Sequence, residues 1–315
     1  MINLQIIVPP HLAGKRLDQA AADLFPQYSR ARLQAWIRDQ QLQVNGHNKR
    51  PRDPVNPGET ITLKAVLPAQ EKWQPQAIEL EIIYEDEALL IINKPVGLVV
   101  HPAAGNPDST LVNALLHHSP ALANLPRAGI VHRLDKDTSG LLVVAKTLEA
   151  HTALVKQLQA RTIQREYEAI VTGHLVAGGT IDAPLGRHPV QRKKRMVTDF
   201  GKPAVTHYRV LEHFRHYTRL KVQLETGRTH QIRVHMTHIH HPIVGDKTYG
   251  GRLQLPKGAS PELIQVLRTF KHQALHAQRL GLVHPMTKED MAWTAPLPAD
   301  MQHLLEVLRR DKLQS

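Results

Sequence analysis

Residues 129–140 run Gly-Ile-Val-His-Arg-Leu-Asp-Lys-Asp-Thr-Ser-Gly and form the densest group of chemically active side chains in the sequence. Asp135 stands between Arg133 and Lys136, and a Thr-Ser-Gly turn follows it. A single carboxylate beside an arginine is in most proteins a structural ion pair, so this segment alone favours no function. Its meaning depends on the sequence around it.

The flanking sequence predicts an α+β domain with a mixed, largely antiparallel sheet. Strands are expected at residues 80–84, 89–92, 141–145, 167–171 and 220–224, from buried apolar runs or from alternation. Helices are expected behind Ser109 and over residues 147–161. Several strands follow one another closely enough for antiparallel pairing.

The first 66 residues predict a small separate module. From Leu12 to Arg52 there are eight basic and three acidic residues, a net charge of +5. Apolar spacing predicts one helix over 17–24, ended by Pro26, and a second helix with Ser29 as its N-cap. An Asn45-Gly46 turn and a strand at 61–63 follow. The basic side chains of the second helix are Arg30, Arg32 and Arg38.

Length and composition limit the remaining choices. The 315 residues suit two domains, and residues 67–79, aperiodic and containing Pro68 and Pro75, are expected to be a linker between domains at 1–66 and 80–315. The net charge of +12 favours a polyanionic partner, although a solvated surface also explains it. The lack of cysteine excludes disulfides, thiolate metal sites and cysteine nucleophiles. With neither a secretory signal nor a membrane-spanning apolar run, a cytoplasmic protein is expected.

Longer segments resemble one enzyme family. No phosphate loop, dinucleotide fingerprint, nucleophile elbow or zincin motif is present. Residues 129–147, GIVHRLDKDTSGLLVVAKT, resemble the signature of the pseudouridine synthases that act on large-subunit ribosomal RNA. Further segments resemble motifs of that family in the same order, at residues 93–102, 165–169, 224–233, 273–277, 284–285 and 295–298. Residues 13–65 resemble the S4 RNA-binding domain, whose basic helix lies against RNA phosphates.

This resemblance implies the isomerisation of specific uridines in 23S ribosomal RNA, with the helix 69 hairpin as target, by a monomer without a cofactor. It implies that Asp135 is the catalytic carboxylate, that Arg228 is its ion-pair partner and that Tyr167 lies against the target base. Arg133 would fill the space left by the flipped uridine. Whether the carboxylate attacks C1′ or removes a ribose proton stays open. On pattern alone, Tyr167 would be a core residue and Arg228 a surface cation.

Other basic residues are assigned to RNA or to support. Lys94 and His132 stand near the motifs and are expected to support the site or contact phosphates. Five cations within nine residues are expected to bind phosphate for affinity; the alternative is a solvated, disordered loop. They are Arg187, Arg192, Lys193, Lys194 and Arg195.

Two other functions remain as alternatives. A non-enzymatic RNA-binding or ribosome-assembly factor would need the basic module but not Asp135. A metal-dependent phosphodiesterase or nuclease would use the histidines between His230 and His241 with Asp135 or Asp246. Those histidines match no standard ligand spacing, so we interpret them as packing and RNA-facing residues and expect no metal.

Overall fold

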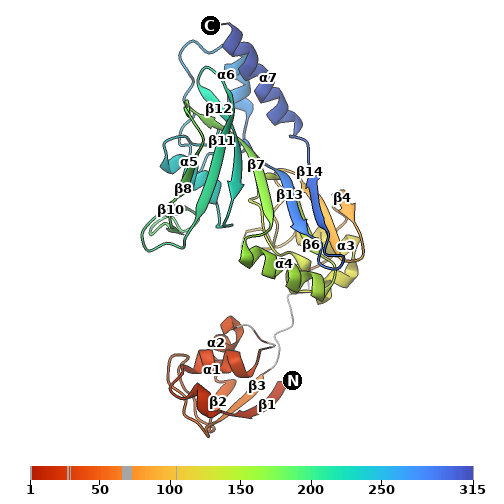
Figure 1. The fold of residues 1–315 in the computed structure, drawn as a ribbon, viewed down its shortest axis with the longest axis vertical. Coiled ribbons are helices and arrows are strands. Elements are labelled where there is room, and N and C mark those ends of the chain that lie inside the picture. The colour runs from red at the N-terminus through yellow and green to blue at the C-terminus, as the bar shows by residue number, and fades with distance from the viewer. Residues whose placement is uncertain (1, 27, 29, 66–72, 104, 315) are drawn as a thin grey trace. The chain divides into compact units, whose positions relative to one another are not determined.

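The structure is a computed structural model of the chain and describes residues 2–26, 28, 30–65, 73–103 and 105–314. The chain divides into two compact units, Met1–Lys72 and Trp73–Ser315 (Figure 1). No helix in these described ranges has the length and apolar character needed to cross a membrane.

The first unit packs two helices and a three-stranded antiparallel sheet around one core. Its elements are β1 (Ile2–Ile7), a 3-10 turn (Pro10–Leu12), α1 (Leu17–Leu24), α2 (Arg30–Arg38), β2 (Leu42–Val44) and β3 (Thr60–Ala65). The strand order is β1-β3-β2. Ala20, Leu33, Trp36, Ile61 and Leu63 lie in the core, which confirms the expected inward faces of the helices.

One strand of this unit was not predicted, and one predicted capping residue lies outside the described residues. β1 was not predicted, and its side chains alternate between exposed and half-buried positions along the edge of the sheet. The predicted turn is present, with φ of 51° at Asn45 and 77° at Gly46, the left-handed region that these two residue types tolerate. Ser29, the expected N-cap, lies outside the described residues.

A nine-stranded mixed sheet forms the frame of the second unit. Its path is β4 (Glu81–Glu85), β5 (Leu89–Lys94), β6 (Ser139–Ala145), β13 (Leu275–Val283), β7 (Gln164–Thr172), β12 (Tyr217–Leu224), β11 (Val205–His213) and β8 (Gly179–Asp182), with β14 (Asp290–Thr294) on β13. Among the pairs of this sheet only β6 and β13 run parallel. The predicted fold class, α+β with a largely antiparallel sheet, is confirmed.

Helices cover the sheet, and a small hairpin stands beside it (Figure 1). They are α3 (Leu111–His118), α4 (Leu148–Ala160), α5 (Gln231–His238), α6 (Pro261–Thr269) and α7 (Ala299–Leu313), with 3-10 turns at Pro120–Asn124 and Pro126–Gly129. The hairpin is formed by β9 (Leu185–Arg187) and β10 (Arg195–Val197). α4 begins after Thr147, whose hydroxyl accepts from the Ala150 N–H, so the expected helix is confirmed.

Part of the expected linker contacts the second unit. Residues 67–72 lie outside the described residues, but Trp73 packs against the core of the second unit. The Asn113 side chain donates to the Gln74 carbonyl at 2.8 Å, and the Gln76 N–H donates to the Asn113 carbonyl at 3.0 Å. These hydrogen bonds fix residues 73–76, a property that their composition did not indicate.

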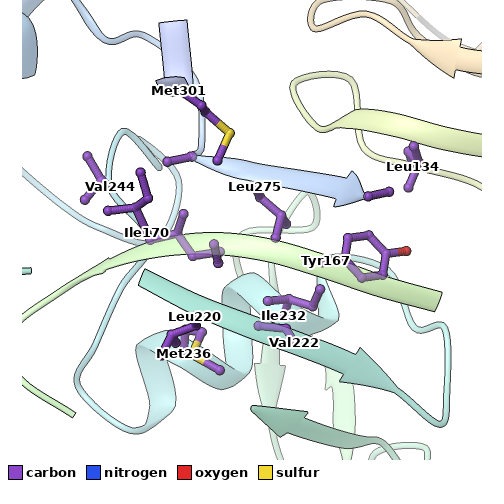
Figure 2. Close-up of a cluster of buried hydrophobic side chains, with 14 of the residues drawn as sticks. Leu134, Tyr167, Ile170, Leu220, Val222, Ile232, Met236, Val244, Leu275 and Met301 are labelled. Carbon is purple, nitrogen blue, oxygen red and sulfur yellow. The ribbon is translucent and has the colours of Figure 1, made fainter. Parts of the chain in front are cut away.

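The core of the second unit extends to the candidate site. Figure 2 shows Tyr167 and Leu134 at one end of a cluster that continues along β7 and β12 to Leu220 and includes Met236 of α5. Seven of the nine residues of β7 are buried in an unbroken run, as expected for a central strand covered on both faces. Its side chains are therefore held in place where the strand reaches the site.

Candidate active site

Asp135 is held in a tight loop between the core and β6. Leu134, only 4% exposed, anchors the loop in the core, and the Thr138 N–H donates to the Asp135 carbonyl at 3.1 Å. The Gln273 amide donates to the Thr138 hydroxyl at 3.0 Å, and the Ser139 hydroxyl lies 2.8 Å from Nδ1 of His276. The Asp135 side chain is 15% exposed, so its carboxylate is largely shielded yet accessible.

Lys94 lies under this loop rather than at a surface. It is 1% exposed, and its ammonium donates to the carbonyls of Pro95 at 2.7 Å, Leu98 at 3.0 Å and Lys136 at 3.0 Å. Burial lowers its pKa to about 8, against the opposing influence of Asp137 and Asp135. A side chain enclosed in this way cannot contact phosphate, so of the two roles expected for Lys94 the structure favours support.

The arginine that binds Asp135 is Arg233. Its Nη1 lies 3.0 Å from Oδ2 of Asp135, while its Nε and Nη2 lie 2.7 and 2.9 Å from the two oxygens of Asp246. Its guanidinium carbon lies 5.1 Å from the centre of the Tyr249 ring, a cation–π distance. Burial opposes the charge of Arg233, but the two carboxylates outweigh it and raise its pKa.

The predicted pairing of Asp135 with Arg228 is therefore wrong. Arg228 is exposed, and its Nε donates to the Pro203 carbonyl at 3.1 Å. The intervening turn is held by Gln231, whose side-chain oxygen accepts from the Arg228 N–H at 2.9 Å and from the Thr226 hydroxyl at 2.7 Å. α5 begins at Gln231, and it is the helix that directs Arg233 towards Asp135.

Tyr167 lines the same cavity as Asp135, from the middle of β7. It is 6% exposed and packs in the hydrophobic cluster of Figure 2. Burial raises the pKa of its phenol, the positive charge of Arg165 opposes this, and Asp135 adds to it. It is thus both a core residue and a wall of the cavity.

Arg133 and His132 flank Asp135 with different characters. Arg133 is exposed at the cavity wall. His132 accepts a hydrogen bond from the Val143 N–H at 3.2 Å through Nε2, and burial, followed by the charge of Arg165, lowers its pKa to about 3. His132 is therefore neutral near pH 7, and the structure gives it support of the strand rather than a phosphate contact.

These groups surround a cavity of about 950 Å³. Asp135, Arg233 and Tyr167 line it together with Arg133, Arg165 and Arg228. Its lining has two carboxylates, Asp135 and Glu225, a phenol and several cations, which suits a polar, anionic ligand with a flat ring. His230 also lines it, with Nε2 3.8 Å from Asp135 and a pKa that burial lowers.

Two arginines of the first unit contact other side chains of that unit. Arg30 lies 2.6 Å from Asp18, a carboxylate with no exposed surface, and keeps 46% of its own side chain exposed. The Arg32 guanidinium lies 5.9 Å from the centre of the Trp36 ring. Arg38 is exposed in the last turn of α2. Arg30 therefore has a structural ion pair in addition to any contact with RNA.

The basic run lies on the hairpin of β9 and β10, not in a disordered loop. The Lys194 N–H donates to the Gln191 carbonyl at 2.7 Å, and the Arg195 N–H donates to the Tyr249 hydroxyl at 2.8 Å. Arg192 and Lys193 are exposed at its turn. Tyr249 also contacts His230 at 2.8 Å, so the hairpin adjoins the cavity wall.

The clustered histidines have separate partners. His235 is fully buried between the Thr206 hydroxyl at 2.8 Å and the Ala183 carbonyl at 2.9 Å, and His241 lies 2.8 Å from the Thr172 carbonyl. Within the described part of the chain, no three histidine, aspartate or glutamate side chains are grouped to hold a metal ion. Packing is the role that these contacts give His235 and His241.

Arg233 and Arg165 were not identified from the sequence as members of the site, and Asp246 was considered only as a metal ligand. Arg233 and Arg165 both lie inside segments that resembled family motifs, but position in a motif does not say where a side chain points. Asp246 is 4% exposed, and its Oδ1 also accepts from the N–H groups of Thr248 and Tyr249 at 2.9 and 3.1 Å.

Comparisons with known proteins agree with this geometry. A family model described as RNA pseudouridylate synthase matches residues 88–238, and an S4 domain model matches residues 15–61. Ribosomal large subunit pseudouridine synthase D of Pseudomonas aeruginosa is 61% identical over 312 residues, 99% of this chain and 98% of that protein. The protein of that name in Escherichia coli K12 is 56% identical over 311 residues, 98% of this chain and 95% of that protein.

Solved structures show the same architecture. Human RNA pseudouridylate synthase domain containing 4 matches with a TM-score of 0.58 and 26% identity, over 73% of this chain and 93% of that one. A second human structure, domain containing 1, matches with a TM-score of 0.55 and 25% identity, over 74% and 96%. The chain therefore belongs to the RNA pseudouridine synthase family and is an enzyme that isomerises uridine in RNA.

Proposed function

We propose that this protein converts specific uridines of 23S ribosomal RNA into pseudouridine, that the helix 69 hairpin contains its targets, and that Asp135 is the catalytic carboxylate. The role of Asp135 is supported by its position in the cavity. Its Oδ2 lies 3.0 Å from Nη1 of Arg233, and Tyr167 lines the same cavity. The names of the two ribosomal relatives support the choice of RNA.

The reaction needs only groups that this chain supplies. The N1–C1′ bond breaks, the base turns, and a C5–C1′ bond forms; C5 loses a proton and N1 gains one, so the composition is unchanged. Asp135 faces the sugar, either as the nucleophile at C1′ or as the base that removes a ribose proton. Arg233 orients its carboxylate through the ion pair at 3.0 Å.

The other groups bind and position the nucleotide. Tyr167 stacks on the target base, and its phenol is within the cavity where the C5 proton leaves. Arg133, exposed at the wall, fills the space that the flipped uridine vacates, which offsets part of the few kcal/mol that flipping costs. Arg228 stays near the mouth as a phosphate contact. One chain supplies all of these groups, so we propose that it acts as a monomer.

RNA outside the cavity is bound by two basic surfaces. The S4-like domain, residues 1–66, contributes Arg32 and Arg38, with the exposed part of Arg30. The catalytic domain, residues 80–315, contributes the turn between β9 and β10 with Arg192 and Lys193. Contacts of this kind give affinity and register but do not select a base.

The test measures tritium release from 5-³H-uridine in 23S ribosomal RNA. Wild type should release tritium and Asp135→Asn should release none, while RNA affinity stays within about threefold, since the carboxylate is not a phosphate contact. Asp137→Asn, in the same loop, is the matched control and should keep activity. Full activity of Asp135→Asn would remove Asp135 from the mechanism, and unchanged RNA with wild type would refute the ribosomal substrate.

A further inference from the structure

Arg165 is a buried cation whose guanidinium has no hydrogen-bond or ion-pair partner in the described part of the chain. It lies on β7 and lines the cavity, yet only 9% of its surface is exposed. Its Nε is buried and makes no hydrogen bond, and within the described residues no carboxylate lies within 4.0 Å of its guanidinium. Arg233, similarly buried in the same cavity, is bound by two carboxylates.

An unpaired guanidinium in such a place is costly for the folded protein. Arginine cannot shed its proton in a protein, so it cannot lower the cost by becoming neutral as lysine or histidine does. A buried charge is normally paired, and a buried polar atom without a partner calls for an explanation. The partner of Arg165 is therefore expected to arrive with the ligand of the cavity.

The position of Arg165 indicates which part of the RNA it meets. It stands two residues before Tyr167 on one strand, so both side chains project from the same face of the sheet. Its charge opposes the rise in the pKa of Tyr167 and adds to the burial that lowers the pKa of His132, so it acts on the wall against which the base packs. In the proposed binding mode the phosphates stay outside the cavity, where the exposed Arg228 is available to contact them.

The turn after β12 leaves space for this guanidinium. A Cβ atom at Gly227 would lie 2.6 Å from Nη1 of Arg165, closer than such atoms approach. Any other residue there would displace the guanidinium towards the centre of the cavity or out of it. The guanidinium of Arg165 therefore packs against the backbone of Gly227.

We propose that Arg165 binds the uracil ring of the flipped nucleotide, donating to a carbonyl oxygen of the base and stabilising the negative charge that the ring carries after its bond to the sugar breaks. This inference rests on the proposed function. When the N1–C1′ bond breaks, its electron pair stays on N1 and spreads over the two carbonyl oxygens. The charge disappears when C5 bonds to C1′, the C5 proton is lost and N1 is protonated. Arg165 is then a catalytic residue, because its interaction strengthens as that charge develops.

The experiment combines Arg165 variants with altered substrates. Single-turnover rates are measured on a 23S fragment carrying uridine, 2-thiouridine or 4-thiouridine at the target position, since sulfur accepts hydrogen bonds poorly. Arg165→Met should slow uridine conversion by about 10²–10³-fold with little change in RNA affinity, and Arg165→Lys should recover part of the rate. With wild type, one of the two thio-substrates should react more slowly than uridine, because its sulfur replaces the oxygen that Arg165 binds. With Arg165→Met, that thio-substrate and uridine should react at the same rate.

Two controls separate this role from a structural one. Arg165→Met should be at least as stable to heat as wild type, because it removes an unpaired buried charge; Gly227→Ala should slow the reaction while keeping that charge. The proposal is overturned if both thio-substitutions slow the reaction by the same factor in wild type and in Arg165→Met. It is also overturned if replacing a phosphate beside the target by a neutral methylphosphonate slows wild type but not Arg165→Met. A third contrary result is that Arg165→Met mainly unfolds the protein. A wild type inactive on this RNA would instead refute the proposed function.

Discussion

Replacing Arg233 by methionine measures what one guanidinium contributes to the site. Methionine is of similar length but leaves two carboxylates without their cation. Asp246 has a side chain only 1% exposed, and Asp135 one that is 15% exposed. Asp246 keeps the Thr248 and Tyr249 N–H groups, but these do not neutralise it.

The loss of stability follows from that burial. Removing one partner of a buried ion pair costs about 3–5 kcal/mol, chiefly because the other charge is left uncompensated. The second unit spans Trp73–Ser315. For a domain of that size each kcal/mol lowers Tm by about 2–4 °C, so Arg233→Met should lower the Tm of this unit by roughly 6–20 °C.

Calorimetry of the full chain is the assay. Unfolding enthalpy scales with size, so the larger transition belongs to the second unit. The matched variants are Asp246→Asn and the double variant Arg233→Met/Asp246→Asn. Asparagine keeps an oxygen for the two N–H donors but carries no charge, so the double variant should melt above Arg233→Met alone.

A double variant that melts at or below Arg233→Met would contradict this expectation. That result would mean that packing of the guanidinium, not the stranded charge of Asp246, sets the cost. A second comparison sharpens the test. Asp135→Asn in the Arg233→Met background should restore less than Asp246→Asn, because Asp135 is the more exposed carboxylate.

Two further predictions concern pH and salt. The pKa of His132 is lowered from 6.5 to about 3, so between these pH values the unfolded chain binds a proton at this residue and the folded chain does not. The contribution of His132 to the free energy of unfolding is therefore complete above pH 6.5 and is lost as the pH falls towards 3. His132→Asn, which keeps an acceptor for the Val143 N–H, should narrow the difference in urea midpoint between pH 7 and pH 4.5, and an unchanged difference would contradict a neutral His132. Arg192→Ser/Lys193→Ser should reduce the slope of log Kd against log salt by about 2, whereas the exposed Lys257→Ser should leave it unchanged; equal slopes would exclude the hairpin turn from RNA contact.

The sequence predicted the elements that depend on local pattern. The strand at 141–145 and the helix over 147–161 are present because an apolar run and an N-cap are signals carried by neighbouring residues. The resemblance of the flanking segments then indicated the family.

Side-chain direction could not be predicted in this way. The segment from Thr226 to Arg233 contains two arginines, and the choice between them depends on where α5 begins and on the left-handed His230, with φ of 58°, just before it. Lys94 has the composition of a surface residue, but three carbonyls that converge from the loops after β5 and before β6 enclose it. Contacts across long sequence separations decide both cases.

The parallel pairing of β6 with β13 has a consequence for the time at which the enzyme becomes active. Ser139 and His276 are 137 positions apart, and Gly140 allows contact because a Cβ there would lie 2.3 Å from the Ala277 carbonyl oxygen. A chain emerging from the ribosome folds its first domain early, from local contacts. The loop of Asp135 lacks its hydrogen bonds to Gln273 and His276 until β13 has emerged, so the first domain is complete well before the catalytic site is.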